Sequence, residues 1–274
     1  MDNDGNEVSS TPAYAADGTT EIGTFSIDPA TGQVTFTPTD KSYTGAVTPV
    51  KVQAESSNGI KVDTTYTPEI VPVTPTATPA ETTDIQGATQ TGKPEFKGGT
   101  VTVDGVEKTV EINEDVPATF DDGSTTKTVE GVGTYTVAAD GTVTFVPEKS
   151  FVGTAPAVTV VREDKNGTKA SATYTPTVTA VTPTATPAET TGVQGATQTG
   201  KPEFTAGNSR VPMNDDVPAT FDDGSTTKTV DGVGTYTVAA DGTVTFVPEK
   251  SFVGTAPAVT VVREDKNGTK ASAT

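Results

Sequence analysis

The sequence lacks the side chains on which most enzymes and metalloproteins depend. Its 274 residues include no cysteine, no histidine and no tryptophan, and leucine is absent as well. Without cysteine there can be no disulfide, thiolate metal site or cysteine nucleophile. Without histidine the chain lacks the commonest general base and metal ligand. We therefore assign no catalytic, cofactor-binding or metal-ligating residue, expect no cofactor, and place enzymes last among the functional classes.

Basic residues and long apolar runs are also scarce. The 36 acidic side chains outnumber the 18 basic ones, which gives a net charge of −18. Proteins that bind nucleic acid neutralise phosphates with lysine and arginine, so this balance argues against a nucleic-acid partner. A membrane-spanning helix needs roughly 20 apolar residues in succession, and no run in the sequence approaches that length.

Large apolar residues are few, which leaves two kinds of chain in competition. Valine, isoleucine and phenylalanine make up about a fifth of the residues, a level at which highly charged chains are often disordered. Threonine and valine make up about a third, and β-branched side chains favour strands. Composition alone permits either disorder or an all-β fold with small cores.

The order of the residues contains a repeat, because two long segments each occur twice. The pairs are Val73–Phe96 with Val181–Phe204, and Asp115–Thr173 with Asp216–Thr274. Only three positions differ between these copies: Asp84 becomes Gly192, Ile85 becomes Val193, and Glu130 becomes Asp231. Between the two segments, Lys97–Asn113 is replaced by the shorter Thr205–Asn214. A change in length at this point predicts an exposed loop or short hairpin.

The first part of the chain is a more diverged copy. Its matching segments are Gly23–Phe25, Val34–Pro38, Lys41–Gly45, Asn58–Gly59 and Thr65–Pro68. They preserve alternation, aromatic residues and turn glycines, which are features of a fold. We expect three repeats: residues 1–72, diverged and truncated at the N-terminal side; residues 73–180, complete; and residues 181–274, truncated before the last strand segment. We interpret the chain as part of a longer tandem array.

Each complete repeat contains period-two segments separated by turn signals. Thr134–Val137 and Thr142–Phe145 flank an Asp-Gly turn, and Ala157–Arg162 and Thr168–Thr175 flank an Asn-Gly turn. Asp121–Ser124 marks a third turn. Regularly spaced short strands of this kind, with no helical period, predict an antiparallel Ig-like β-sandwich. The fold class is therefore all-β, with tandem sandwiches, and the ordered alternation favours folding over disorder.

The sequence also predicts the cores and the linkers. We expect the large core residues of a repeat to be Phe96, Phe120, Tyr135, Phe145, Phe151 and Tyr174. Val71–Thr83 and its match Ala180–Thr191 are rich in proline and threonine. Proline fixes φ and disfavours helix, so these segments are expected to be extended, polyproline-like linkers.

Calcium binding is one special chemistry that the sequence suggests. Asp2–Asn6 begins like an EF-type loop, but Glu7 stands at the glycine position and Ala13 at the glutamate position, so the match fails. Asp121 and Asp122 with Glu163 and Asp164 could form a looser site at a repeat junction, although acidic turns are common in anionic proteins. Carboxylate pairs for sugar hydrolysis are disfavoured, because an enzyme rarely repeats its site along an array.

Covalent modification is a second special chemistry that the sequence suggests. Lys93, Glu95 and Asn166, or their copies Lys201, Glu203 and Asn267, are the residue types of an intramolecular isopeptide bond. That bond requires burial, whereas Lys93 precedes a proline and Asn166 occupies a turn, so ordinary surface roles are favoured. Asn166–Thr168 also fits a glycosylation sequon, but a turn is the simpler interpretation.

Four segments of the second repeat resemble the CshA-type fibril repeat of streptococcal surface adhesins. They are Thr91–Phe96 (TGKPEF), Val116–Val129 (VPATFDDGSTTKTV), Gly131–Gly153 (GVGTYTVAADGTVTFVPEKSFVG) and Val158–Thr179 (VTVVREDKNGTKASATYTPTVT). The resemblance covers essentially all of the second and third repeats and, more loosely, the first. It implies a wall-anchored fibril on a Gram-positive cell, anchored through a region absent here. In such a fibril tandem repeats form the stalk, and other regions contact host matrix or other cells.

Two functions from different classes remain. The first is a structural stalk whose repeats contact one another and project a separate adhesive region from the cell wall. The alternative is a binding module, in which the repeats themselves engage host glycoprotein or glycan or pair with copies on other cells. A binding surface would present an exposed apolar patch of several hundred Å². The few aromatic residues alternate inward in the predicted strands, which favours the stalk.

Overall fold

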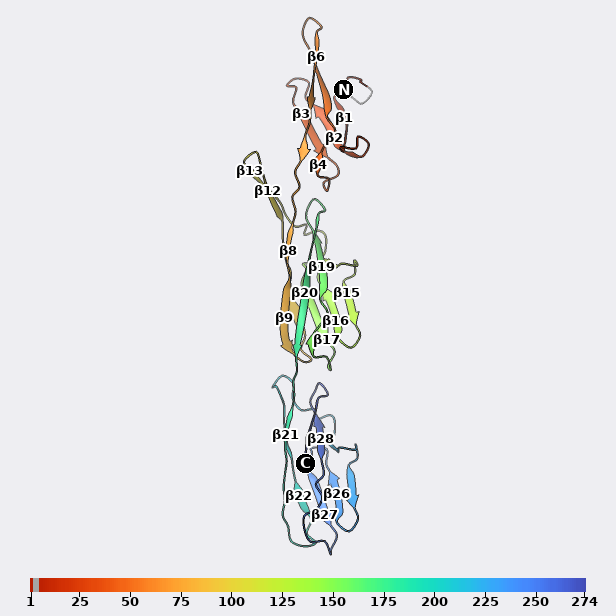
Figure 1. Cartoon of the computed structure of the whole chain (residues 1–274), viewed down its shortest axis with the longest axis vertical. Coiled ribbons are helices and arrows are strands. Elements are labelled where there is room, and N and C mark those ends of the chain that lie inside the picture. The colour runs from red at the N-terminus through yellow and green to blue at the C-terminus, as the bar shows by residue number, and fades with distance from the viewer. Residues whose placement is uncertain (2–4) are drawn as a thin grey trace.

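The alternating threonine and valine residues form short strands along the whole chain. The computed structural model describes residue 1 and residues 5–274, and within them it contains no helix. No helix long and apolar enough to cross a membrane is therefore present in this part of the chain. Three all-β units follow one another along a single long axis (Figure 1). We call them repeat 1 (residues 1–72), repeat 2 (residues 73–180) and repeat 3 (residues 181–274).

Repeat 1 contains one three-stranded sheet and two strand pairs. Its strands are β1 (Ser10–Tyr14), β2 (Glu21–Ile27), β3 (Val34–Pro38), β4 (Gly45–Ala46), β5 (Val50–Glu55), β6 (Lys61–Tyr66) and β7 (Glu69–Ile70). They pair in the orders β1-β2-β3, β4-β7 and β5-β6. Phe25 on β2 faces Phe36 on β3, with ring centroids 5.5 Å apart, and Ile22 and Val47 are buried beside them.

Repeat 2 is a sandwich of two sheets. Its strands are β8 (Thr76–Thr78), β9 (Ala80–Ile85), β10 (Gln90–Gly92), β11 (Glu95–Lys97), β12 (Gly99–Val103), β13 (Val106–Val110), β14 (Thr119–Phe120), β15 (Thr126–Val129), β16 (Gly133–Val137), β17 (Val143–Pro147), β18 (Gly153–Thr154), β19 (Val158–Glu163) and β20 (Lys169–Thr179). One sheet has the order β10-β17-β16-β15 and the other β14-β19-β20-β18, with β9 also paired to β20. Strands β8 and β11 form a separate pair, and β12 and β13 form a hairpin.

The strands of repeat 3 repeat this plan in part. They are β21 (Thr184–Thr186), β22 (Gln198–Gly200), β23 (Glu203–Thr205), β24 (Thr220–Phe221), β25 (Thr227–Val230), β26 (Gly234–Val238), β27 (Val244–Pro248), β28 (Val261–Glu264) and β29 (Lys270–Ala273). The sheets have the orders β22-β27-β26-β25 and β24-β28-β29, and β21 pairs with β23. The prediction of an all-β chain built from sandwich repeats is confirmed.

The predicted hairpins form where their turn residues stand. Strands β16 and β17 pair around the Asp-Gly turn, and β19 and β20 pair around the Asn-Gly turn. Within Lys97–Asn113, residues Gly99–Val110 form the predicted exposed hairpin, β12–β13. The turn at Asp121–Ser124 has a different role, because β14 pairs with β19 and β15 pairs with β16. It therefore carries the chain from one sheet to the other.

The core of repeat 2 lies between its two sheets. Four of the six predicted core residues, Phe120, Tyr135, Phe145 and Tyr174, are fully buried, whereas Phe96 and Phe151 are partly buried against them. The rings of Tyr135 and Phe145 lie 4.6 Å apart. Tyr135 Oη donates a hydrogen bond to the Pro156 carbonyl at 2.7 Å, and burial raises the pKa of this phenol to about 12. The buried hydroxyl of Tyr135 thus has a partner, as buried tyrosine hydroxyls usually do.

The prediction of a polyproline-like linker over Val71–Thr83 is wrong for most of its length. Only Val71–Pro75 lies outside strands before β8, and β9 belongs to the sandwich. Strand β9 pairs with β20 in parallel, from Ala80 opposite Tyr174 to Ile85 opposite Thr179. This parallel pair also departs from the expected purely antiparallel pattern. Hydrogen bonding to β20 holds these threonines in strand conformation, because β20 presents a free edge there.

The same sequence behaves differently in repeat 3, which shows what β9 depends on. Ala188–Thr191 is identical to Ala80–Thr83, yet it forms no strand. Thr274, the last residue described, is the counterpart of Thr173, so the structure contains no segment matching Tyr174–Thr179 that could pair with Ala188–Thr191. The formation of strand β9 therefore depends on pairing with β20 and not on local sequence preference alone.

Replacing Gly92 by alanine is expected to destabilise repeat 2 specifically. A Cβ at Gly92 would lie far inside the van der Waals distance of the Tyr174 ring, and overpacking of a core typically costs about 1–3 kcal/mol. The matched control is Gly200→Ala in repeat 3, where the nearest atom is Cγ2 of Thr190 at 3.1 Å. Thr190 lies outside any strand and can shift, so its effect should be much smaller.

The stability of each repeat can be measured separately because the chain has no cysteine. A cysteine at Val160 in repeat 2, or at its counterpart Val261 in repeat 3, is buried and reacts with thiol reagents only when that repeat opens. Gly92→Ala should accelerate labelling at position 160 and leave position 261 unchanged. Equal effects of Gly92→Ala and Gly200→Ala would contradict the proposed packing of Tyr174.

Candidate joint between repeats 2 and 3

The chain passes from repeat 2 to repeat 3 through a short, anchored segment. Strand β20 ends at Thr179 and β21 begins at Thr184. Val181, between them, is buried, and its N–H donates to Gln86 Oε1 at 3.2 Å. Gln86 is itself buried; its Nε2 donates to the Lys149 carbonyl at 2.8 Å. The loop after β9 therefore holds the chain at the point where it leaves repeat 2.

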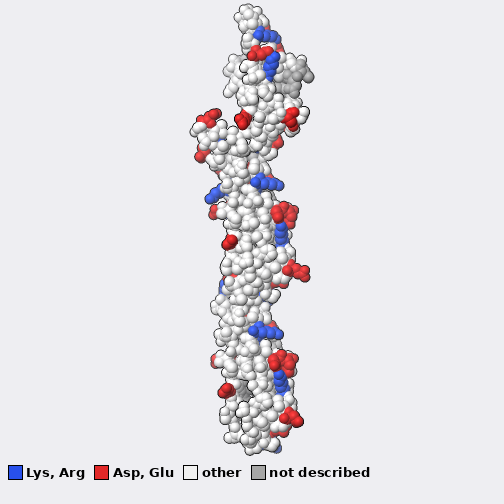
Figure 2. All heavy atoms as spheres, viewed as in Figure 1, with Lys and Arg blue, Asp and Glu red and all other residues white. Residues whose placement is uncertain are grey.

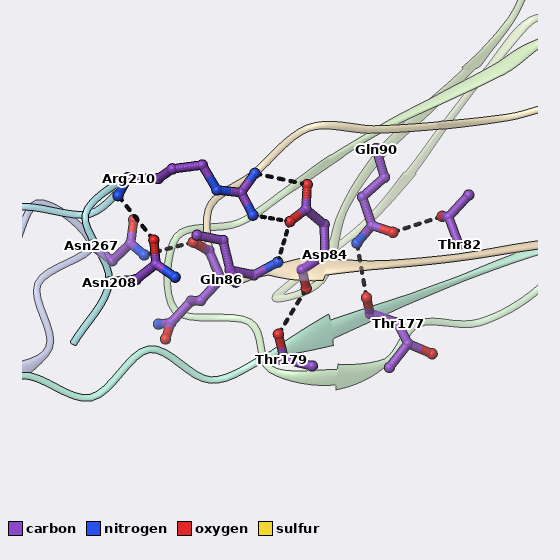
Figure 3. A network of polar contacts seen from close by, with 10 residues as sticks. Thr82, Asp84, Gln86, Gln90, Thr177, Thr179, Asn208, Arg210 and Asn267 are labelled. Atoms are coloured by element: carbon purple, nitrogen blue, oxygen red, sulfur yellow. Dashed lines mark hydrogen bonds and ion pairs between the residues drawn. The ribbon is translucent and has the colours of Figure 1, made fainter.

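A charged pair joins the two repeats beside this segment. Asp84, near the end of β9, accepts hydrogen bonds from both terminal nitrogens of Arg210, which lies in the loop Thr205–Asn214 of repeat 3 (Figure 3). The Nη1–Oδ2 distance is 3.1 Å. Asn208 Oδ1 accepts the Arg210 backbone N–H at 2.9 Å, which fixes the loop. Two-point pairing of this kind orients one repeat against the other.

A second contact forms between the loop after β9 and the turn between β28 and β29. Asn267 Nδ2 donates to the Gln86 carbonyl at 2.8 Å, as Figure 3 shows. Gly87 follows with a φ of +80°, and a Cβ at this position would collide with the Asn267 side chain. Asp265 is buried and holds the turn by accepting the N–H groups of Asn267 and Thr269, each at 2.9 Å. Both sides of the joint are therefore built on ordered turns.

Acid is expected to loosen this joint. The hydrogen bonds from Arg210, followed by the N–H of Ile85, lower the pKa of Asp84 below its usual 3.8. A lowered pKa means that the pair stabilises the docked joint above about pH 4, and that this contribution is lost as the pH falls through the lowered value. Between pH 7 and about pH 2, the spread of distances between spin labels on repeats 2 and 3 should widen. In the control variant Asp84→Asn, the spread of distances should already be wide at pH 7. If the variant and the unmodified chain had the same pH profile, this result would contradict the role of Asp84.

The joint between repeats 1 and 2 is built differently. It consists of Val71–Pro75, a five-residue segment with two prolines. The hairpin β12–β13 of repeat 2 stands where repeat 3 has the Arg210 loop, and it extends to one side of the axis (Figure 1). Gly99 at its base lies against the backbone of Thr74. The two joints thus differ in one segment: the hairpin β12–β13 at the joint between repeats 1 and 2, and the Arg210 loop at the joint between repeats 2 and 3.

The isopeptide residues considered above are not arranged for that reaction. Lys93 Nζ lies 2.8 Å from Asp140 Oδ2, and both side chains are about half exposed. Lys201 and Asp241 form the same exposed pair at 2.7 Å. Both lysines therefore lack the burial that this bond requires. Asn267 takes part in the joint instead.

The acidic residues considered for calcium have other partners. Lys127 lies between Asp121 and Asp122 and contacts both. Asp164 is buried and accepts the N–H groups of Asn166 and Thr168 at 2.8 and 2.9 Å, so this segment acts as a turn. Within the described residues no group of three or more acidic side chains could hold a metal ion. Asp2, Asn3 and Asp4 lie outside those residues.

Sequence reasoning did not identify the joint, although the sequence carried a signal of it. Asp84 is one of the two residues that differ between otherwise identical 24-residue copies. Arg210 stands in the one loop that was exchanged between repeats. Asp84 has no acidic counterpart in repeat 3, and Arg210 has no arginine counterpart in repeat 2. An ion pair between two neighbouring repeats produces this pattern.

Comparisons with known proteins agree with the repeated architecture. The sequence profile described as "Surface adhesin CshA repetitive domain" matches residues 1–70, 72–178 and 180–274. No curated protein matches the chain.

Among solved structures, the chain is 60% identical to repeat domain 13 of the fibrillar adhesin CshA from Streptococcus gordonii. The match covers 24% of this chain and 86% of that one, with a TM-score of 0.16. Mouse cadherin-23 EC22–24 is 12% identical over 97% of this chain and 83% of that one, with a TM-score of 0.31. The I9–I11 tandem from titin is 11% identical over 96% and 86%, also at 0.31. Because all three TM-scores are below 0.5, the fold assignment rests on the strand pairing itself.

Proposed function

The chain belongs to the family of repetitive domains of the surface adhesin CshA, and from this membership we propose that it is part of the stalk of a bacterial fibrillar adhesin. Its repeats extend the fibril and project a separate adhesive region away from the cell wall. Anchoring to the wall and contact with host matrix or other cells belong to regions outside this segment. The repeats themselves perform no catalysis.

The single observation that supports this proposal most strongly is the docked joint. Repeats 2 and 3 lie end to end (Figure 1), and Asp84–Arg210 and Gln86–Asn267 hold them in one orientation. Such contacts keep the fibril extended, because they resist folding of one repeat back onto its neighbour. Neighbouring repeats of the same chain are therefore the partners that the proposal requires.

The surface is also that of a spacer. Acidic and basic side chains are interspersed along the visible face (Figure 2), which keeps a long protein soluble and discourages lateral sticking. Among the described residues, the exposed large apolar side chains are mostly single valines distributed over all three repeats, and Tyr66 is their only aromatic member. Scattered apolar side chains of this kind are normal on a soluble surface.

The alternative function is that the repeats themselves bind host glycoprotein or glycan, or pair with copies on other cells. The test is binding of the purified chain to immobilised host matrix glycoproteins and to itself over a range of concentrations. A stalk predicts no saturable signal on either surface. Saturable binding at micromolar concentration would overturn the proposal in favour of the binding module.

A further inference from the structure

The path of tension through repeat 2 runs along two neighbouring strands. The chain enters the repeat through Val71–Pro75, ahead of β8 and β9, and leaves it at Ala180, directly after β20. Strands β9 and β20 lie side by side and point in the same direction along the axis (Figure 1). A pull on the two ends therefore drags β9 and β20 in opposite directions along their common axis.

We propose that the parallel pair β9–β20 is a mechanical clamp that bears the tension in repeat 2. The pair spans six residue positions, from Ala80–Tyr174 to Ile85–Thr179. The hydrogen bonds of a ladder run across the strands, so an opposed pull along the strands loads all of them together. A hairpin pulled at its open end loses them one at a time. This load-bearing function rests on the stalk proposal, since a stalk transmits force between its adhesive region and the cell.

Side chains fasten the same pair from within the sandwich. Thr82 Oγ1 donates to Gln90 Oε1 at 2.6 Å, so the hydroxyl of Tyr174, 2.7 Å away, donates to Thr82. Gln90 Nε2 donates to the Thr177 carbonyl at 2.9 Å, and Thr179 Oγ1 donates to the Asp84 carbonyl at 3.1 Å. Figure 3 shows the hydrogen bonds from Gln90 to Thr177 and from Thr179 to Asp84. Tyr174 and Gln90 are buried, where hydrogen bonds have few competing waters.

The proline within β20 leaves the clamp intact. Pro176 has no N–H, and its carbonyl accepts the Ala155 N–H at 2.9 Å on the side away from β9. The N–H and C=O of one strand residue point to the same edge, so the missing donor is on that side too. The carbonyl of Thr179 faces β9 and accepts the Gln86 N–H at 2.8 Å, which extends the ladder beyond Ile85.

The pulling direction provides the test, because a clamp is strong along one direction only. The chain has no cysteine, so introduced cysteines give defined attachment points in the full chain. Handles at Val71→Cys and Ala180→Cys load β9 and β20 in opposed directions. Handles at Val71→Cys and Lys165→Cys are both attached at the end of the repeat where β20 begins, and they do not slide β20 along β9. Each replaced side chain is exposed.

Single-molecule pulling is expected to give a several-fold higher rupture force for the first pair of handles than for the second. Thermal unfolding of the two variants should be the same, which separates mechanical resistance from stability. Thr82→Val should lower the force of the first geometry and leave that of the second unchanged. Equal forces in both geometries would overturn the clamp. This result would leave the stalk proposal standing, because that proposal is tested by binding and by shape.

A gain of resistance in repeat 3 completes the test. In the part of the chain that the structure describes, its segment Ala188–Thr191 pairs with no strand. Extending the full chain beyond Thr274 by a copy of Tyr174–Ala180 should complete the parallel pair and raise the force at which repeat 3 ruptures. An extended chain whose repeat 3 ruptures at the unextended force would contradict the proposal.

Discussion

Tyr174→Ala is expected to destabilise repeat 2 strongly while the stability of repeat 3 stays unchanged. The Tyr174 side chain is fully buried, it packs on Gly92, and its hydroxyl bonds to Thr82. Truncating a buried aromatic residue typically costs about 3–5 kcal/mol. A domain of this size has only about 5–15 kcal/mol of stability in total, so the loss removes a large share of it. The described part of repeat 3 ends at the counterpart of Thr173 and contains no counterpart of Tyr174, so it provides an internal control.

Thiol labelling measures this effect in one molecule. With Tyr174→Ala, a cysteine at Val160 should label at least a hundred times faster, because about 3 kcal/mol corresponds to more than two powers of ten. A cysteine at Val261 should label at its original rate. The conservative variant Tyr174→Phe keeps the ring and loses one hydrogen bond, worth about 0.5–1.5 kcal/mol. A Phe variant as unstable as the Ala variant would show that the hydroxyl, rather than the ring, holds the sandwich together.

Reversing the charge of Asp84 is expected to release the joint between repeats 2 and 3. Asp84→Arg places two guanidinium groups together, removing an attractive pair and adding a repulsive one. Arg210 is 56% and Asp84 29% exposed, so solvent screens the pair and its value is about 1 kcal/mol or less. Removal and repulsion together amount to about 1–2 kcal/mol, which shifts the ratio of docked to undocked joints about 5–30-fold.

Spin labels on the two repeats report this ratio as the width of their distance distribution. Asp84→Arg should broaden the distribution, and so should Arg210→Asp. The double variant restores opposite charges in exchanged positions and should narrow it again. Asp84→Gly copies the residue that repeat 3 carries at Gly192 and should give an intermediate width. A narrow distribution in both single variants would show that Gln86 and Asn267 hold the joint without the ion pair.

The sequence was sufficient for features that depend on near neighbours. Alternation and an Asp-Gly or Asn-Gly dipeptide define a hairpin within about a dozen residues, and the hairpins β16–β17 and β19–β20 form as predicted. The buried positions of Tyr135 and Phe145 follow from the same alternation. The repeated segments extended these predictions to repeat 3 without further information.

Features that depend on distant partners were missed. Prolines at positions 75 and 79 suggested an extended linker, but β9 is stabilised by β20, roughly 90 residues later in the chain. Arg210 lies 126 positions from Asp84, and no local pattern relates the two. The identical segment Ala188–Thr191, which forms no strand without that partner, shows why local propensity could not reveal β9.

Small-angle X-ray scattering of the full chain tests the central claim, that the repeats provide reach. The 11-residue strand β20 is about 36 Å long at about 3.3 Å per residue, so three stacked repeats should give a maximum dimension of about 110 Å. A compact chain of 274 residues would have a radius of gyration of about 19 Å and a diameter of about 50 Å. The account predicts the longer dimension and a step of about 40 Å when repeat 3 is removed. A maximum dimension near 50 Å would contradict it.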